Sequence, residues 1–220
     1  MLNEQQNRAH LKLTERVLEA QEKERAAIGM ELHDNVNQIL TGAKLMLSML
    51  KGGEPQKQKF VDDCSTNIQV AIDENRKIAR ELITPDFKKE KLVTRVSCLV
   101  QGMLKNAGLE VYIDFYFLQE NLLADQQKLT IYRIMQEQFT NIVKHANARK
   151  VEITMSTKNG IFNMVISDDG KGMQAGKNVD GIGLTSIKSR LSVVNGILHI
   201  KNEPDKGFSM EIEIRIPGTE

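Results

Sequence analysis

The 220-residue sequence has no tryptophan, only two cysteines and no excess of either charge. Aromatic residues make up 5% of the chain, which argues against the stacking platforms that bind single-stranded nucleic acid. The 30 basic and 29 acidic residues nearly cancel, so no basic surface for nucleic acid is expected. Cys64 and Cys98 form neither a CxxC pair nor a metal-ligand spacing, as is typical of free thiols in a reducing compartment.

No hydrophobic run approaches the roughly 20 residues that cross a bilayer. The N-terminus also lacks the apolar stretch of a signal peptide. We therefore expect a cytoplasmic chain with no membrane segment of its own. That description also fits the cytosolic part of a longer membrane receptor.

Residues 7–50 contain no proline and only two glycines, which predicts one long helix. Its main apolar positions follow a seven-residue repeat that Arg25 interrupts, namely Leu11, Leu18, Leu32, Ile39 and Met46. The accompanying positions are mixed in polarity, so the pattern is that of an imperfect coiled coil. Such a helix extends about 60 Å, and its apolar stripe needs a partner helix and a second copy of the chain.

A break at residues 51–55 separates this helix from a second one predicted at residues 56–83. Two helices joined by a short turn form an antiparallel hairpin, and two hairpins form a dimeric four-helix bundle. Pro85 marks the predicted domain boundary, because the residue before a proline disfavours the α conformation.

After Pro85 the pattern changes to a mixture of helices and strands. Helices are expected at residues 89–106, 125–146 and 184–195, and strands at residues 109–118, 150–157, 161–167, 197–202 and 208–216. Alternation places Phe117 on the buried face of the first strand, and Met210, Ile212, Ile214 and Ile216 on that of the last. This half of the chain predicts an α/β sandwich, in which helices cover one mixed sheet.

Two candidate sites stand out, and the first lies in the long N-terminal helix. His33 adjoins Asp34, and Asp34 shares a helix face with Gln38 one turn later. An imidazole, a carboxylate and an amide in this arrangement suit proton movement and the positioning of water. A solvated helix surface presents the same spacing.

The second candidate site begins in the helix predicted at residues 125–146. Four polar side chains share one face at three- and four-residue spacing: Glu137, Asn141, Lys144 and His145. The opposite face is apolar and includes Phe139 and Val143. The polar face suits a metal-bound polyphosphate, although a solvated face shows the same pattern.

Two glycine motifs follow the amide helix. Asp168, Gly170 and Gly172 form a DxGxG motif at a strand end, where a carboxylate can accept from an amino group such as that of adenine. The second motif, formed by Gly181, Gly183 and Leu184, leads into a helix whose N–H groups suit an anion. There is no GxxxxGK[ST] sequence, so this is not a Walker-type phosphate loop.

Together these motifs resemble the N, G1 and G2 boxes of the Bergerat-fold ATPases, which include gyrases, heat-shock-90 chaperones and histidine kinases. Segments 24–28 and 31–38 resemble the phosphoacceptor helix of sensor histidine kinases of the nitrate-sensor and desaturase-thermosensor subfamily. The resemblance implies a coiled-coil signalling helix at 1–24, a dimerisation and phosphotransfer domain at 25–84, and a Bergerat-fold ATP-binding domain at 85–220. It also implies a homodimer and a response regulator receiver domain as partners.

The resemblance further implies a role for each site residue. His33 attacks the γ-phosphate of ATP, Asp34 takes up the proton, and Gln38 positions a water that dephosphorylates the response regulator. Asn141 holds Mg²⁺, with Glu137 at its water shell. The remaining nucleotide-binding positions are Lys144 and His145 at the phosphates, Asp168 at the adenine amino group, and Gly170, Gly172, Gly181, Gly183 and Leu184 in and around a lid.

Two positions depart from the family pattern. Phe208 stands where many relatives carry threonine, and Asn37 stands where glycine is common. Two other readings remain open, a Bergerat-fold protein serine kinase and a non-catalytic dimer scaffold that binds nucleotide. The acid lability of a phosphorylated product distinguishes a histidine kinase from a serine kinase, because phosphohistidine is acid-labile and phosphoserine is not.

Overall fold

The computed structural model describes residues 2–50, 55–172, 182–202 and 207–218. The chain divides into two compact units. One comprises residues 16–84, and the other residues 85–220 together with residues 1–15. The first unit is helical, whereas the second is built on a five-stranded sheet.

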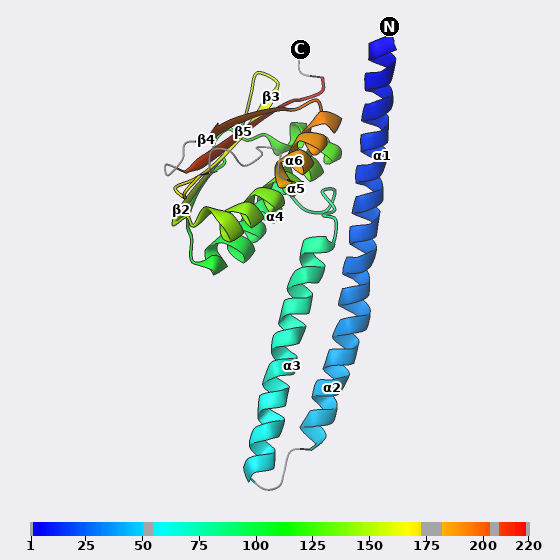
Figure 1. Cartoon of the computed structure of the whole chain (residues 1–220), viewed down its shortest axis with the longest axis vertical. Helices are drawn as coiled ribbons and strands as arrows, with labels where there is room; N and C mark the ends of the chain where they lie inside the picture. Colours follow the sequence, from blue (N-terminus) through cyan, green and yellow to red (C-terminus); the bar gives the residue numbers. More distant parts are fainter. Residues whose placement is uncertain (1, 51–54, 173–181, 203–206, 219–220) are drawn as a thin grey trace. The chain divides into compact units, whose positions relative to one another are not determined.

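The helical unit is an antiparallel hairpin (Figure 1). Helix α1 (Leu2–Glu31), a π turn (Leu32–Val36) and helix α2 (Asn37–Met49) follow one another without a break. Helix α3 (Pro55–Leu82) runs back beside α2 and the adjoining part of α1. Both predicted helices are confirmed, with the difference that the first contains a π turn. Of the predicted break at residues 51–55, residues 51–54 lie outside the described residues, and Pro55 begins α3.

The two arms of the hairpin pack through small and polar side chains as well as apolar ones. Gly29 approaches α3 so closely that an added Cβ would lie 3.1 Å from the carbonyl oxygen of Ala79. The buried side chains of this unit include Val61, Ile72, Ala79, Asn37 and Asn75. A buried polar side chain needs a partner, so the two asparagines are informative about this packing.

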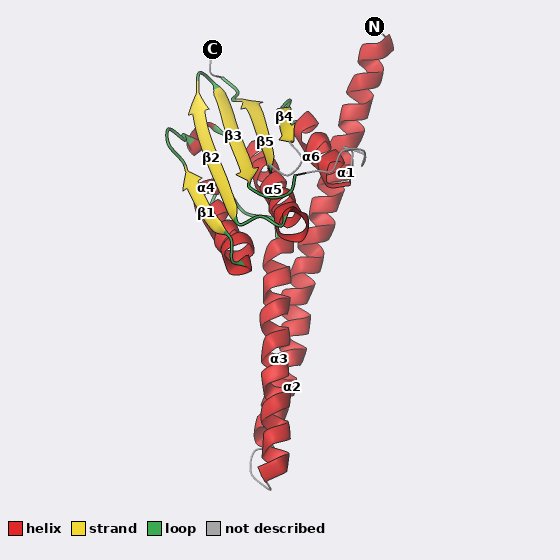
Figure 2. Ribbon diagram, turned by 60° about the vertical axis from the view of Figure 1, so that its left-hand side comes forward, coloured by secondary structure: helices red, strands yellow, loops and turns green. Residues whose placement is uncertain are grey.

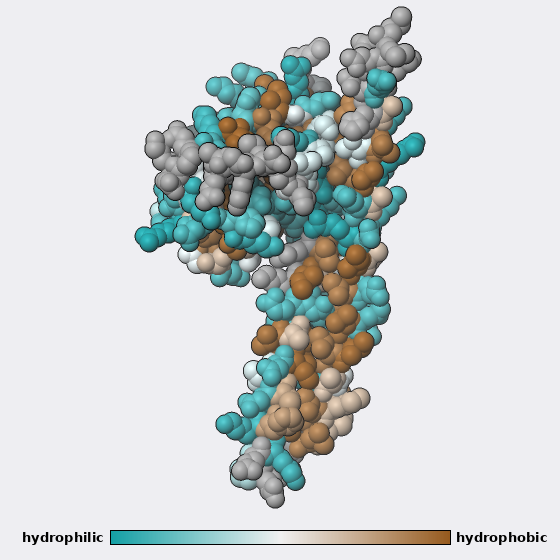
Figure 3. All heavy atoms as spheres, in the orientation of Figure 1, coloured by the Kyte–Doolittle hydropathy of each residue, from teal (hydrophilic) through white to brown (hydrophobic). Residues whose placement is uncertain are grey.

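Another apolar face of the hairpin is uncovered in the single chain. Two of the predicted heptad positions, Ile39 and Met46, are 71% and 70% exposed instead of packed against α3. Other large apolar side chains of the hairpin are also exposed: Leu45, Met49, Leu50, Phe60, Val70 and Ile78. Figure 3 shows this hydrophobic surface extending along the hairpin. A patch of this kind marks an interaction surface.

The second unit is a two-layer sandwich. Its strands are β1 (Glu110–Asp114), β2 (Lys150–Lys158), β3 (Ile161–Asp168), β4 (Ile197–Asn202) and β5 (Phe208–Arg215). They form one sheet in the order β1-β2-β3-β5-β4, in which only the β1–β2 pair is parallel. The mixed sheet predicted from the sequence is therefore confirmed.

Three helices cover one face of this sheet (Figure 2). They are α4 (Leu92–Leu99), α5 (Asp125–Asn141) and α6 (Ile182–Val193). Helices α4 and α5 are each followed by a π turn, at Val100–Leu104 and Ile142–Ala146 respectively.

The core lies between the helices and this face of the sheet. Met210, Ile212 and Ile214 of β5 are fully buried, as the alternation of the last strand predicts. The same alternation in β3 buries Phe162, Met164, Ile166 and Asp168 on one face. The carboxylate of Asp168 therefore continues an apolar row and points to the helical side of the sheet.

Two expectations about the core are wrong, and both fail where regular geometry ends. The predicted strand at residues 109–118 ends at Asp114, whose side chain accepts a hydrogen bond from Tyr116 N at 2.7 Å and turns the chain. Phe117 consequently has φ +64° and is 71% exposed. Val143 is 45% exposed, because the π turn rotates it away from the apolar stripe of α5.

Candidate functional site

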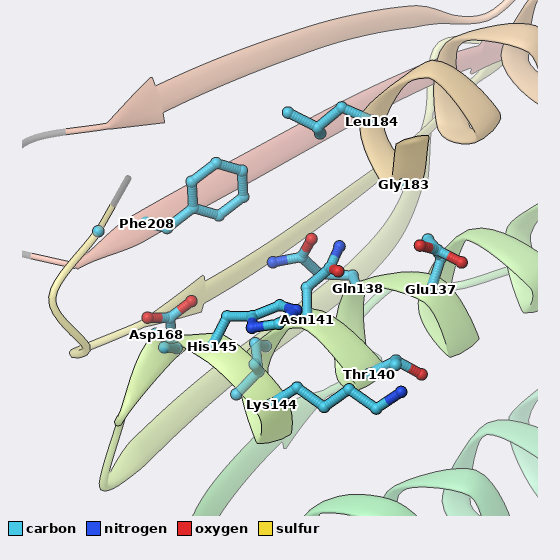
Figure 4. Close-up of a pocket in the computed structure, with 13 residues that line it drawn as sticks. Glu137, Gln138, Thr140, Asn141, Lys144, His145, Asp168, Gly183, Leu184 and Phe208 are labelled. Atoms are coloured by element: carbon cyan, nitrogen blue, oxygen red, sulfur yellow. The ribbon is translucent and has the colours of Figure 1, made fainter. Parts of the chain in front are cut away.

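One cavity gathers most of the predicted nucleotide-binding residues (Figure 4). It has a volume of about 490 Å³ and is lined by α5 and its π turn, the end of β3, and the starts of α6 and β5. Its lining residues are Glu137, Gln138, Thr140, Asn141, Ile142, Lys144, His145, Ala146, Asp168, Gly172, Gly183, Leu184 and Phe208. Of the remaining predicted positions, Gly170 lies just behind the wall, and Gly181 lies outside the described residues.

Asp168 contributes the buried carboxylate of the cavity. It is 8% exposed, and its Oδ1 accepts a hydrogen bond from Gly170 N at 3.0 Å. Burial raises the pKa of this carboxyl above its ordinary value, and the hydrogen bond from Gly170 opposes the rise. Gly170 is required here, because an added Cβ would collide with the carbonyl oxygen of Ala146.

The neighbouring Asp169 has a different task. Its Oδ1 accepts hydrogen bonds from Arg149 N at 2.7 Å and Lys150 N at 2.8 Å. These bonds lower the pKa of Asp169 and tie the end of β3 to the start of β2. Of the two adjacent carboxylates, only Asp168 therefore faces the cavity.

The start of α6 packs against the polar face of α5. A Cβ added to Gly183 would lie 2.5 Å from Glu137 Oε1 and 3.3 Å from Asn141 Nδ2. The helix N-terminus, a carboxylate and an amide thus converge on one side of the cavity. N–H groups at a helix start favour an anion, and Lys144 adds a positive charge to the lining.

Sequence reasoning did not find Gln138. Its side chain is 3% exposed, lines the cavity, and forms no side-chain hydrogen bond within the described parts of the chain. The signal was present, since Gln138, Asn141 and His145 also follow three- and four-residue spacing on α5. Phe208, noted as a departure from the family pattern, is 8% exposed and forms an apolar wall of the cavity with Leu184.

The hairpin carries the other candidate site. His33 Nδ1 and Asp34 Oδ1 are 2.9 Å apart, and the two side chains are 59% and 68% exposed. A carboxylate can only accept, so in the neutral imidazole this contact places the ring proton on Nδ1 and leaves the Nε2 lone pair free. Both residues lie in the π turn, and Gln38 is exposed in the first turn of α2.

The comparisons with known families match both units. Residues 126–218 match the family described as histidine kinase-, DNA gyrase B- and HSP90-like ATPases, and residues 24–87 match a histidine kinase family. The chain belongs to the sensor histidine kinases. The order of the two matched segments agrees with the order of the two sites along the sequence.

Named relatives support this family assignment. The histidine-protein kinase/phosphatase UhpB of Salmonella typhimurium is 30% identical over 196 residues, which cover 86% of this chain and 38% of UhpB. The sensor histidine kinase MctS of Rhizobium johnstonii is 29% identical over 209 residues, which cover 90% of this chain and 44% of MctS. The chain thus spans less than half the length of either relative.

Solved structures agree on the fold. A blue-light-activated histidine kinase of Erythrobacter litoralis aligns with a TM-score of 0.52 at 14% identity, covering 84% of this chain and 60% of that one. Full-length ShkA in complex with AMPPNP aligns with a TM-score of 0.52 at 16% identity, covering 88% and 46%. No helix in the described ranges has the length and hydrophobicity that a membrane span requires.

Proposed function

We propose that this chain is a kinase core that transfers the γ-phosphate of ATP to His33 and then passes it to an aspartate of a response regulator. The observation that carries the proposal is the cavity, in which Asn141, Lys144 and Asp168 meet the glycine-led start of α6. The names of UhpB and MctS as histidine kinases support the activity, and the AMPPNP complex of ShkA supports an adenine nucleotide as the substrate.

The residues of the cavity suit the parts of ATP. The buried carboxylate of Asp168 accepts from the adenine amino group, while Phe208 and Leu184 offer apolar surface to the base. Lys144 and the α6 N-terminus offset the charge of the phosphates.

The residues also suit Mg²⁺, which commonly binds through one or two protein oxygens together with phosphates. The amide oxygen of Asn141 supplies such a ligand, with Glu137 placed to hold a coordinated water. Within the described residues, no three His, Cys, Asp or Glu side chains gather as a metal site. This donor set therefore fits a cation that arrives with the nucleotide.

His33 and Asp34 then carry the chemistry. Nε2 of His33 forms a bond to the γ-phosphorus as the bond from phosphorus to the ADP oxygen breaks. The ring becomes cationic, and the Asp34 carboxylate at Nδ1 stabilises this charge and takes up the Nδ1 proton. The exposure of His33 leaves it accessible to the nucleotide and then to the receiver domain.

The same core is proposed to dephosphorylate its response regulator, with Gln38 positioning the water. The kinase/phosphatase name of UhpB supports this second activity. We assign residues 1–24 to a signalling helix, 25–84 to dimerisation and phosphotransfer, and 85–220 to ATP binding. The homodimer forms through the uncovered apolar face of the hairpin, which includes Ile39 and Met46.

Incubation with radiolabelled ATP and Mg²⁺ tests the proposal. We expect an acid-labile label on the unmodified chain that is lost in His33→Gln and Asn141→Asp. His199→Gln, a change at an exposed histidine on β4, serves as the matched control and keeps the label. Label that survives His33→Gln and resists acid indicates a serine kinase. Nucleotide binding without any label indicates a scaffold.

A further inference from the structure

Two buried asparagines join the arms of the hairpin at the π turn that carries His33. Asn37 and Asn75 are each 8% exposed. Asn75 Nδ2 donates to Asn37 Oδ1 at 3.1 Å and to the carbonyl oxygen of Leu32 at 2.7 Å. Leu32 directly precedes His33, and Asn37 directly precedes Gln38. A single amide group therefore contacts both ends of the turn that carries the phosphoacceptor.

The backbone of this turn departs from α-helical geometry at the carbonyl group that Asn75 contacts. Leu32–Val36 is a π turn, in which Leu32 O accepts from Asn37 N–H. In a regular α-helix that carbonyl oxygen would accept from Val36 N–H instead. Single π turns are frequently found at functional sites. The described chain has two others, at Val100–Leu104 and Ile142–Ala146, so the hydrogen bond from Asn75, and not the rarity of the turn, distinguishes Leu32–Val36. The amide of Asn75 is the second donor to the same carbonyl oxygen, so it stabilises the widened geometry from the opposite arm.

Packing alone does not call for asparagine at these two positions. The other buried positions of α3 include Val61, Ile72 and Ala79, all apolar. Buried amides cost free energy unless their hydrogen bonds are made, and a pair of apolar side chains can fill the same space without that cost. The two asparagines therefore have a role other than packing the interior of the hairpin.

We propose that Asn37 and Asn75 are positioning residues that hold the π turn and thereby set the orientation of His33 and Asp34 for phosphoryl transfer. This inference rests on the proposed function of His33. Reversion of the π turn to α geometry would change the rotation along the helix by about 100°, the advance of one residue. That rotation would move His33 relative to Gln38 and to the surfaces that approach it.

The test removes the hydrogen bonds without leaving a cavity. Asn75→Leu and the double variant Asn37→Leu/Asn75→Leu replace amides with apolar side chains of similar size in the full chain. Gln69→Leu is the control, because Gln69 Oε1 accepts from Lys44 Nζ across the same hairpin, far along the helix from His33. Three quantities are measured: the autophosphorylation rate at saturating ATP, the ATP dissociation constant and the melting temperature.

We expect the double variant to melt at or above the melting temperature of the unmodified chain. Its autophosphorylation should nevertheless be about 10- to 100-fold slower, because small displacements of reacting groups cause rate losses of this size. ATP affinity stays unchanged, and Gln69→Leu stays within twofold of the unmodified rate. The two single changes are expected to be non-additive, because they break one network. A double variant as active as Gln69→Leu overturns the inference, as does a rate loss that only follows a loss of stability.

A measurement independent of ATP separates this inference from the proposed function. Nitrogen NMR of the His33 ring reports which ring nitrogen carries the proton. We expect the Nδ1–H form in the unmodified chain and a mixture of forms in Asn75→Leu, because the contact with Asp34 is then no longer held. Identical spectra in the two proteins contradict the positioning role, whether or not the chain is a kinase. A chain that shows the spectral change but never incorporates phosphate contradicts only the proposed function.

Discussion

The hairpin site and the sandwich site are built in opposite ways. His33 and Asp34 are 59% and 68% exposed and are already paired with each other. In the cavity, Gln138 and Asp168 are only 3% and 8% exposed and face an open volume. A group that two different partners must reach has to stay accessible, whereas a nucleotide pocket has to hold its donors and acceptors ready. On the proposed function, the local pairing would set the reactivity of the first site, and burial would set the affinity of the second for its nucleotide.

Among the changes that test this contrast, Asp34→Asn is expected to lower the autophosphorylation rate most. The amide still accepts from His33 Nδ1 but cannot take up its proton, so autophosphorylation falls by about 10²- to 10⁴-fold. ATP affinity stays the same, because the change lies in the hairpin. Single-turnover labelling and nucleotide titration measure the two quantities.

Asp73→Asn is the control for this change, since Asp73 is an exposed carboxylate of the same hairpin that accepts from Gln69. It should leave both quantities unaltered. An equal loss of ATP affinity in Asp34→Asn would break the separation between the two sites.

A pair of glycine changes sharpens the comparison inside the sandwich. In Gly183→Ala the added Cβ meets the flexible end of Glu137 at 2.5 Å, so Glu137 turns away while the fold persists. We expect a loss of about tenfold in phosphorylation rate with little change in melting temperature. In Gly170→Ala the Cβ meets the backbone carbonyl of Ala146, and the fold loses about 1–3 kcal/mol of stability.

Rate measurements and thermal denaturation of the two proteins distinguish these outcomes. If Gly183→Ala unfolds the chain and Gly170→Ala does not, the start of α6 is structural and the assignment of Glu137 to the metal's water shell loses its support.

Regular periodicity accounts for what the sequence could predict. The alternation of Met210, Ile212 and Ile214 and the proline-free run before Leu50 each repeat over many residues, so local sequence determines them. Phe117 and Val143 were misplaced where a turn at Asp114 and a π turn interrupt that regularity. Neither interruption has a periodic signal.

The sites show the same limit. DxGxG and the spacing of Glu137 and Asn141 are local patterns, and the structure brings these residues to one cavity. The hydrogen bond between Asn37 and Asn75 joins residues 38 positions apart, so no local sequence pattern predicts it. Gln138 was missed for a related reason, since only its burial against the cavity distinguishes it from an ordinary helix glutamine.

Two buried glutamines of α5 allow a smaller test of the pocket. Gln138 lacks a side-chain hydrogen bond in the described chain and lines the cavity, so Gln138→Leu should change the stability of the nucleotide-free protein by no more than about 1 kcal/mol. It should also weaken ATP binding by about tenfold or less, the worth of one hydrogen bond. Denaturant titration and calorimetry measure the two changes.

Gln127→Leu is the matched control for this change. Gln127 Nε2 donates to Arg215 O at 2.7 Å, and its Oε1 accepts from Ala124 N at 3.0 Å. Its replacement should therefore destabilise the protein by about 1–3 kcal/mol without affecting ATP affinity. A Gln138→Leu protein that loses stability in the same way would place the Gln138 amide in the fold and not in the binding site.

The smallest expected effect is the part of the pH dependence of nucleotide binding that comes from the buried carboxylate of Asp168. Burial raises the pKa of Asp168 above the ordinary value of 3.8, and an adenine amino group favours the ionised form. As the pH falls toward the raised pKa, more of the free protein is protonated at Asp168 and must lose that proton to bind. Affinity therefore decreases with acidity, by less than the limit of about tenfold per pH unit for one proton.

Calorimetric titration with ATP between neutral and mildly acid pH measures the total slope. Asp168→Asn removes the contribution of the carboxylate and keeps that of the nucleotide's own ionisation. Asp169→Asn should retain a slope that is moved to lower pH. Burial, the largest cause of the raised pKa of Asp168, is unchanged in this variant, whereas the charge of Asp169, which also raises the pKa of Asp168, is lost. Equal slopes in the unmodified chain and in Asp168→Asn would remove the carboxylate from the binding site. The contrast between His33, exposed and paired with Asp34, and Asp168, buried and proposed to accept from the nucleotide, would then no longer hold.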